Sequence, residues 1–128
     1  MKEIKFRAWD KQKKIETNWK CYDNMFYFMD KYTGVWIRDD EFERFVLLQY
    51  TGLKDRNGIE IYEGDIGRWY IAKGNEFILF EVLWIEEEAR FMGRYKDEYG
   101  NYRFISLINS DKGLEIIGNI YEKPELLE

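Results

Sequence analysis

Turn signals recur along the whole chain and constrain its fold more than any other feature of the sequence. The strongest is Asp55-Arg56-Asn57-Gly58, because Asn-Gly supplies the two residues of positive φ that a type I′ hairpin turn needs. Glycine among polar residues predicts further turns at four places, which are 33–34, 73–75, 99–101 and 111–113. The chain is therefore expected to form a series of short antiparallel hairpins.

Several segments between these turns carry apolar side chains at every second position, as strands with one buried face do. Ile4, Phe6 and Ala8 share one face of the first segment, and Leu114 and Ile116 share a face near the end of the chain. This period of two predicts strands in both segments.

Residues 77–85 break the alternation, because they are apolar on both faces. Their β-branched and aromatic side chains predict a central strand that is covered on both sides. Glu81 is the exception within this run. We expect either an ion pair with Arg90, Arg94 or Arg103 on a neighbouring strand, or a position on a partly solvated face.

Helical signals are few. Asp39 or Asp40 is suited to cap a short helix that carries Phe42, Phe45 and Val46 on one side. This is the single place before the C-terminus where the sequence predicts a helix.

The C-terminus and the hairpins together define the expected fold class. Pro124 before Glu125-Leu126-Leu127 predicts a closing helical turn with proline at its first position. The fold class is mainly β, with short antiparallel strands and hairpins that form one or two small SH3-like, barrel-like sheets and little helix. Residues 1–128 are predicted to be a single domain, with a soft subdivision near residue 50 as the alternative.

The composition is that of a globular protein, with 45% apolar and 35% charged residues. Cys21 stands alone, so neither an intramolecular disulfide nor a four-cysteine metal site can form. We expect Cys21 to be a small core side chain, with a reactive thiol as the alternative. No segment approaches the roughly 20 apolar residues of a membrane helix, and the first residues lack the apolar stretch of a signal peptide. The protein is therefore predicted to be cytoplasmic, without membrane contact.

Most enzyme chemistries lack their essential residues here. The sequence has no histidine, which excludes Ser-His-Asp and Cys-His catalysis and histidine-ligated zinc. It also has no glycine-rich phosphate-binding motif. Two-carboxylate chemistry remains, but Glu60 and Glu63 are expected to point to opposite faces of a strand. We expect no enzymatic activity, catalytic residue, cofactor, metal or small-molecule substrate.

Three sequence blocks carry a family resemblance. The first is Ile4-Lys5-Phe6-Arg7-Ala8-Trp9-Asp10, the second runs from Leu48-Gln49-Tyr50-Thr51-Gly52 to Gly64-Asp65-Ile66, and the third runs from Glu115-Ile116-Ile117-Gly118-Asn119 to Leu127. In this order they resemble the YopX family. The resemblance implies a phage or prophage origin, a bacterial host and a mainly β fold, and it implies no established activity. Gly67 stands where the family usually has a β-branched residue, so that strand is expected to start late or to carry a bulge.

Protein–protein contact is the function that the composition favours. Four aromatic residues are expected to be exposed beside basic ones, a combination typical of interface anchors. They are Trp9, Trp19, Trp36 and Tyr50, near Arg7, Lys20 and Arg38. The leading hypothesis is a phage-encoded, non-catalytic binding or assembly module whose molecular role is unknown.

The charge distribution adds a hypothesis of self-association. Residues 1–20 hold seven basic and three acidic side chains, and the whole chain has a net charge of −5, so the remainder carries −9. A basic face of one copy is therefore suited to meet an acidic face of another. The plain alternative is a solvated surface.

The second hypothesis is binding of single-stranded nucleic acid on a small barrel, by stacked aromatics and a basic groove. The speculative interaction surface comprises Lys5, Arg7, Trp9, Lys11, Lys13 and Lys14. The net charge of −5 opposes this hypothesis at long range. Carbohydrate stacking on the aromatics is a third hypothesis, which a cytoplasmic location disfavours.

Overall fold

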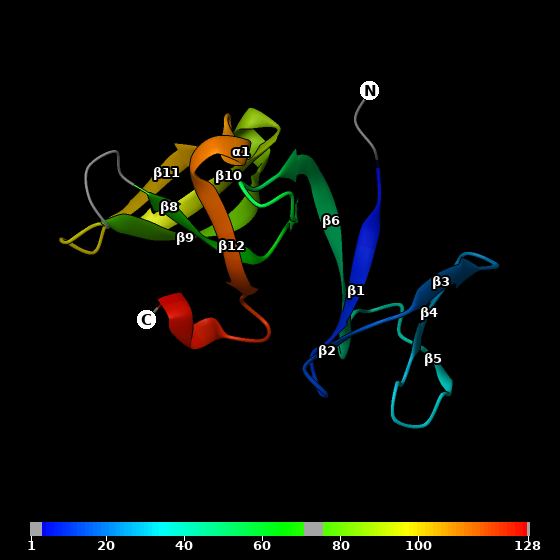
Figure 1. The fold of residues 1–128 in the computed structure, drawn as a ribbon. Helices are drawn as coiled ribbons and strands as arrows, with labels where there is room; N and C mark the ends of the chain where they lie inside the picture. Colours follow the sequence, from blue (N-terminus) through cyan, green and yellow to red (C-terminus); the bar gives the residue numbers. More distant parts are fainter. Residues whose placement is uncertain (1–3, 71–75, 128) are drawn as a thin grey trace. The chain divides into compact units, whose positions relative to one another are not determined.

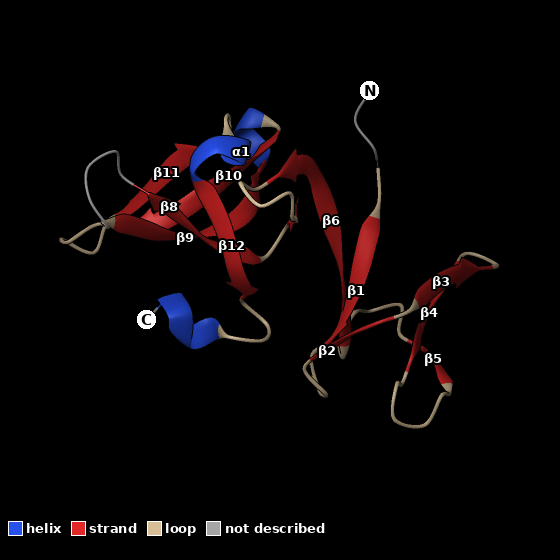
Figure 2. Cartoon of the chain, viewed as in Figure 1, coloured by secondary structure: helices blue, strands red, loops and turns tan. Residues whose placement is uncertain are grey.

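The computed structural model describes residues 4–70 and 76–127. These residues contain twelve strands, a four-residue α-helix and two 3₁₀ helices, joined by turns and loops (Figures 1 and 2). All strand pairs are antiparallel. The prediction of a mainly β fold of short antiparallel strands is confirmed. No helix within the described ranges has the length and apolar character that crossing a membrane requires.

Residue contacts divide the chain into two compact units, with the division between Gln49 and Tyr50. We call them the N-terminal unit and the C-terminal unit. The long strand β6 (Phe45–Lys54) passes from the first into the second. Whether the two units behave as one domain stays a prediction.

The N-terminal unit contains two small sheets. In one, β1 (Phe6–Asp10) pairs with β2 (Ile15–Thr17) on one side and with the first half of β6 on the other. The other sheet consists of β3 (Trp19–Tyr22), β4 (Met25–Met29) and β5 (Trp36–Arg38). Their shared core contains Ala8, Phe28 and Phe45, and the two phenylalanine rings stack with centroids 4.8 Å apart.

The C-terminal unit is built on a five-stranded sheet of order β11-β10-β9-β8-β12. The second half of β6 pairs beside it with β7 (Glu60–Tyr62). The short helical elements are η1 (Glu86–Glu88), α1 (Ser110–Gly113) and η2 (Pro124–Leu127). The five strands are β8 (Asp65–Tyr70), β9 (Phe77–Ile85), β10 (Arg90–Lys96), β11 (Tyr102–Ser106) and β12 (Leu114–Asn119).

Phe80 is the centre of the core of the C-terminal unit. The sheet curves so that Leu114 of β12 reaches the same buried cluster as Phe80 of β9, and Figure 1 shows β12 turned across the direction of β9. The Phe80 ring lies against two glycines of the neighbouring strands. A β-carbon at Gly67 would lie 2.6 Å from Phe80 Cζ, and one at Gly93 would lie 2.6 Å from Phe80 Cδ2. The ring is therefore enclosed from both sides, and neither position has room for a side chain.

This contact accounts for the glycine at position 67 in this chain. The expectation of a late start or a bulge in its strand is wrong, because β8 begins at Asp65 and is continuous. The extra residue lies in the partner strand, where the register of β12 shifts between Ile116 and Gly118. Gly67 is needed for the Phe80 ring rather than for a bulge.

Asp55 organises the hairpin between β6 and β7. Its buried carboxylate accepts the N–H groups of Asn57 at 2.8 Å and Ile59 at 2.9 Å. The N–H of Gly58 donates to the Asp55 carbonyl at 3.0 Å. Within the turn only Gly58 has positive φ, so the predicted type I′ turn is wrong. The aspartate side chain supplies the bonds that define a different turn.

The predicted helix near Asp39 is also wrong. Phe45 begins β6, and Phe42 has a φ of +54°, which a helix does not allow. The Asp39 carboxylate does accept the N–H groups that follow it, from Glu43, Arg44 and Phe45. Asp39 therefore acts as a cap, but of a turn that leads into a strand.

Other local predictions have mixed outcomes. The central strand at residues 77–85 and the closing turn that begins at Pro124 are confirmed. The expectation that this strand is covered on both sides is wrong, because Phe77 and Trp84 are exposed. The turn predicted at 111–113 is a short helix, and Cys21 is exposed rather than in the core. The turn predicted at 73–75 lies outside the described residues.

We predict that Gly67→Ala destabilises the protein by about 1–3 kcal/mol, because the new methyl group overlaps a ring that cannot move away. Urea denaturation measures the loss. Gly113→Ala is the matched control, since nothing lies within 4 Å of its β-carbon position. The loss should shrink when Gly67→Ala is combined with Phe80→Leu. Equal stability of the two single variants would contradict this account.

Candidate functional site

An open groove lies on the outer face of β9, β10 and β11. Its volume is about 540 Å³. Along β9, Phe80 and Val82 point into the core, so Leu79 and Glu81 take the opposite face and reach the groove. The apolar part of the lining comprises Phe77, Ile78, Leu79, Leu126 and Leu127.

The charged side chains of the groove come from neighbouring strands. Arg94 of β10 lies opposite Glu81 of β9, and Arg94 Nη2 is 3.1 Å from Glu81 Oε1. Arg94 is one of the three partners predicted for Glu81. Lys96 lies next along the same face of β10, and no described acidic residue forms an ion pair with it. Among the described residues, the groove therefore carries one cation that is not already neutralised.

Tyr102 of β11 borders the two cations. The Arg94 guanidinium lies 4.4 Å from the centre of its ring, and the Lys96 ammonium lies 5.3 Å from it. Tyr102 is nevertheless 53% exposed, and Phe104, two residues further along the same face, is 49% exposed. An exposed aromatic surface thus adjoins the cationic part of the groove.

The opposite wall is the C-terminal turn η2, which packs against β9. Asn119 sets its direction, because its buried Oδ1 accepts the N–H groups of Tyr121 and Glu122. Gly118 lets the turn approach, since a β-carbon there would lie 3.3 Å from Leu126 Cδ1. None of these contacts was predicted from the sequence, although Asn119 before a proline-led turn was a visible signal.

Tyr121, which lies between β12 and this turn, is partly buried. Burial raises the pKa of its hydroxyl, and the carboxylates of Glu63 and Glu81 raise that pKa further. The hydroxyl therefore stays protonated at neutral pH.

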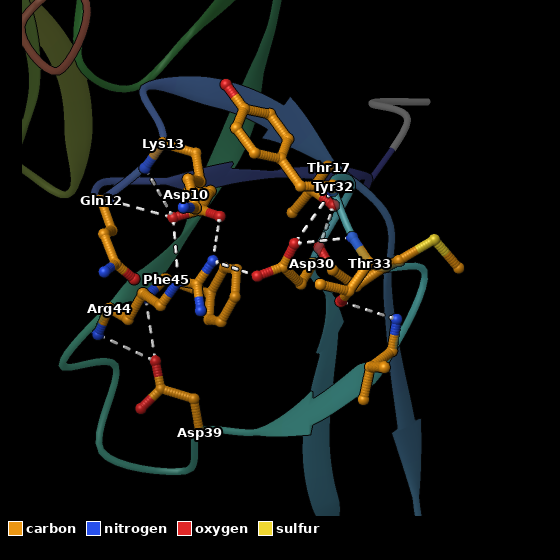
Figure 3. Close-up of polar contacts among 12 residues, drawn as sticks. Asp10, Gln12, Lys13, Thr17, Asp30, Tyr32, Thr33, Asp39, Arg44 and Phe45 are labelled. Atoms are coloured by element: carbon orange, nitrogen blue, oxygen red, sulfur yellow. Dashed lines mark hydrogen bonds and ion pairs between the residues drawn. The ribbon is translucent and has the colours of Figure 1, made fainter.

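A second concentration of charge is buried in the N-terminal unit (Figure 3). Arg44 Nη2 lies 2.8 Å from Asp10 Oδ2 and 2.8 Å from Asp30 Oδ2, and Arg44 Nε donates to Asp10 Oδ1. The Asp10 carboxylate also accepts the N–H groups of Gln12 and Lys13, which shape the turn after β1. Arg44 thus connects the end of β1 to the residue that follows β4.

The two carboxylates keep their charge because of Arg44. Its hydrogen bond, with those of nearby backbone N–H groups, lowers the pKa of Asp30 to about 2. Burial acts to raise the pKa of Asp10, but hydrogen bonds from Arg44 and the following backbone outweigh it, so that pKa is lowered. Both carboxylates are fully engaged within the fold, which identifies the cluster as structural. No group of three potential metal ligands occurs within residues 4–70 and 76–127.

The comparisons with known proteins agree with the resemblance. The family described as YopX protein matches residues 5–128. The chain belongs to the YopX family. Protein EF1440 from Enterococcus faecalis has a similar crystal structure, with 26% identity, a TM-score of 0.60 and full coverage of both chains. The crystal structure of yopX from Bacillus subtilis is similar in fold, with 20% identity, a TM-score of 0.61 and full coverage of both chains. No curated protein matches the chain.

Polar residues of the three sequence blocks that resemble the YopX family form hydrogen bonds that hold turns of the fold. Asp55 and Asn119 hold turns, as described above, and the buried Asp65 carboxylate accepts the N–H of Tyr62 at 2.7 Å. Asp65 and Asn119 lie opposite each other where β8 pairs with β12, and Asp55 also accepts the N–H of Ile116 in β12. The blocks that reveal the family therefore stabilise its fold.

The predicted surface near the N-terminus is only partly exposed. Trp9 is 6% exposed and Tyr50 is 4% exposed, so the expectation that both are surface aromatics is wrong. Both were counted as surface residues because strand alternation does not show what covers the second face. Trp36, in contrast, is exposed, and Lys20 lies 4.2 Å from the centre of its ring.

The basic residues of that surface do not converge on Trp9. Lys11 Nζ donates to the Phe42 carbonyl at 3.2 Å, while Lys13 lies 4.8 Å from the ring of the exposed Tyr32. Lys5 just before β1 and Arg7 within it are half-buried, and Lys14 is exposed in the turn that follows β1. The role of Lys5, Arg7, Trp9, Lys11, Lys13 and Lys14 as an interaction surface stays a prediction.

We predict that Asp30→Asn destabilises the protein at neutral pH and that this effect disappears in acid. The pKa of Asp30 is about 2 in the folded state against the ordinary 3.8. Its stabilisation is therefore complete above about pH 4 and is lost as the pH falls through about 2. Urea midpoints of both proteins, measured from neutral pH downward, give the difference.

Glu16→Gln is the control for this titration, because Glu16 is exposed and forms no ion pair with the described residues. It should leave the midpoint nearly unchanged at every pH. A difference between wild type and Asp30→Asn that does not vary with pH would refute the role of the charged pair.

Proposed function

We propose that this protein is a phage- or prophage-encoded, non-catalytic binding or assembly module that acts through protein–protein contacts, with the groove as its docking surface. The observation that carries the proposal is that one open groove combines an apolar lining with exposed Tyr102 and with Lys96. Apolar anchors with aromatic and cationic residues are the composition of interface centres.

The groove suits a protein segment that combines an apolar side chain with a carboxylate. Leu79, Leu126 and Leu127 offer an apolar contact, and Lys96 offers a charge that is not neutralised within the described residues. Arg94 is already bound to Glu81 and over Tyr102, so it is held in place for a further contact. In such a segment, the carboxylate would contribute specificity by pairing with Lys96, and the apolar side chain would contribute affinity by contact with the apolar lining.

The proposal of a non-catalytic role rests on the residues available. The sequence has no histidine to act as a base near neutral pH. Glu81 is the one carboxylate in the described lining of the groove, and Arg94 binds it. Glycoside hydrolysis by two carboxylates would require a second one nearby.

The experiment compares protein captured by full-length wild type and by two charge-reversal variants. Each is purified gently at low salt from phage-bearing host cells and weighed by native mass spectrometry. Wild type is expected to carry an adduct of a protein other than a second copy of this chain, and Lys96→Glu is expected to lose it. Lys112→Glu makes the same charge change at an exposed residue of α1, outside the groove, and should keep it.

Either of two results would contradict the proposal. One is an adduct of a protein other than this chain that Lys96→Glu retains as well as Lys112→Glu does. The other is a wild-type protein that carries no adduct under these conditions.

Binding of single-stranded nucleic acid remains a second candidate, favoured by one observation. Lys13 lies over exposed Tyr32, which places a cation and a stacking surface together in the basic N-terminal region. Fluorescence anisotropy of a labelled oligothymidine tests it. Binding should weaken steeply between low and moderate salt and should be lost in Lys13→Glu. No binding at low salt would end this candidate.

A further inference from the structure

The two edges of the five-stranded sheet differ in how far they are covered. At the β12 edge, the N–H of Ile116 donates to Asp55 Oδ2 at 2.9 Å, and the N–H of Arg56 donates to the Leu114 carbonyl at 2.9 Å. The bulge between Ile116 and Gly118 further interrupts this strand. Such features stop another strand from pairing there.

At the other edge, the register shows which backbone groups of β11 face outward. The N–H of Asp97 donates to the Asn101 carbonyl, so this pair closes the hairpin between β10 and β11. Hydrogen-bonded and non-bonded pairs alternate from that point. Lys96–Tyr102 and Arg94–Phe104 are therefore non-bonded pairs.

The backbone groups of Tyr102, Phe104 and Ser106 thus point away from β10. None of them forms a hydrogen bond with another described segment. Three residues in alternation are enough to bond one short strand. The β11 edge is open where the β12 edge is closed.

The side chains at this edge are apolar and unusually exposed. Phe104 is 49% exposed, and Tyr102 is 53% exposed. The cation within the strand is neutralised, because Arg103 Nε lies 3.0 Å from Asp97 Oδ2. Charged residues normally protect an edge from pairing, and β11 has no such residue without a partner.

We infer that β11 pairs antiparallel with β11 of a second copy of this chain, which forms a dimer through the C-terminal unit. The strand is self-complementary about its central residue, Phe104. A twofold axis there places Phe104 opposite the partner subunit's Phe104, and Tyr102 opposite the partner subunit's Ser106. The aromatic pair at the axis adds to the backbone hydrogen bonds.

The closed β12 edge limits the assembly to two copies. Pairing at both edges would extend into a fibre. Pairing of β11 with β11 alone uses the open edge of both copies and therefore stops at a dimer. The inference goes beyond the proposed function, because it uses the edge of β11 rather than the groove.

The test is the mass of the full-length protein in solution, measured by sedimentation over a wide range of concentration. Wild type is expected to reach twice the 15.7 kDa of one chain. Phe104→Lys should weaken the dimer at least about tenfold, because it places two ammonium groups at the axis. Tyr99→Lys makes the same charge change in the neighbouring turn and should leave the dimer intact.

Hydrogen exchange provides a readout that needs no variant. The amides of Tyr102, Phe104 and Ser106 should exchange more slowly as the protein concentration rises, while the Ile116 amide should be protected throughout. A wild-type protein that remains monomeric at the highest concentration, or a dimer that Phe104→Lys leaves unchanged, would overturn the inference. Lys96→Glu should dimerise normally, so loss of the groove contact and loss of the dimer are distinguishable.

Discussion

The Asp55 carboxylate is the contact on which the C-terminal unit most depends. One oxygen accepts two N–H groups of the β6–β7 turn, and the other accepts the N–H of Ile116 in β12, 61 residues away. Asp97 forms the same turn between β10 and β11, with bonds from the N–H groups of Tyr99 and Asn101. Its second oxygen binds Arg103 instead of another strand. The same aspartate-bonded turn therefore covers the β12 edge of the sheet, through Asp55, and leaves the β11 edge open, at Asp97.

Alternation along β9 accounts for both the core and the groove. Phe80 and Val82 fill the inner face, where Gly67 and Gly93 make room for the Phe80 ring. The residues between them lie on the outer face, where Glu81 joins Arg94 across the strands. Packing on one face thus fixes the spacing of charge on the other, and η2 then supplies the wall that makes a groove.

The sequence predicts what depends on neighbouring residues and misses what depends on distant ones. The run of apolar, β-branched and aromatic residues at 77–85 located β9 with its bounds, and the need of Glu81 for a cationic partner named Arg94 among the candidates. The Arg44 cluster was not predicted, because its members are separated by 14 and 34 residues and no pattern joins them. The burial of Trp9 was missed for a similar reason, since it depends on what covers the second face of β1. The wall formed by η2 depends on packing against β9, so the groove could not be read from the sequence either.

The central claim is that the groove on β9, β10 and β11 meets a protein partner. Site-specific photocrosslinking in phage-bearing cells tests it most directly, with a benzophenone amino acid in place of Phe77, which lines the groove and is partly exposed. The same replacement at exposed Tyr22, in the N-terminal unit, is the control. The account predicts a crosslinked product of discrete protein mass from position 77 and none from position 22. A product from position 22 alone, or no product from position 77, would contradict it.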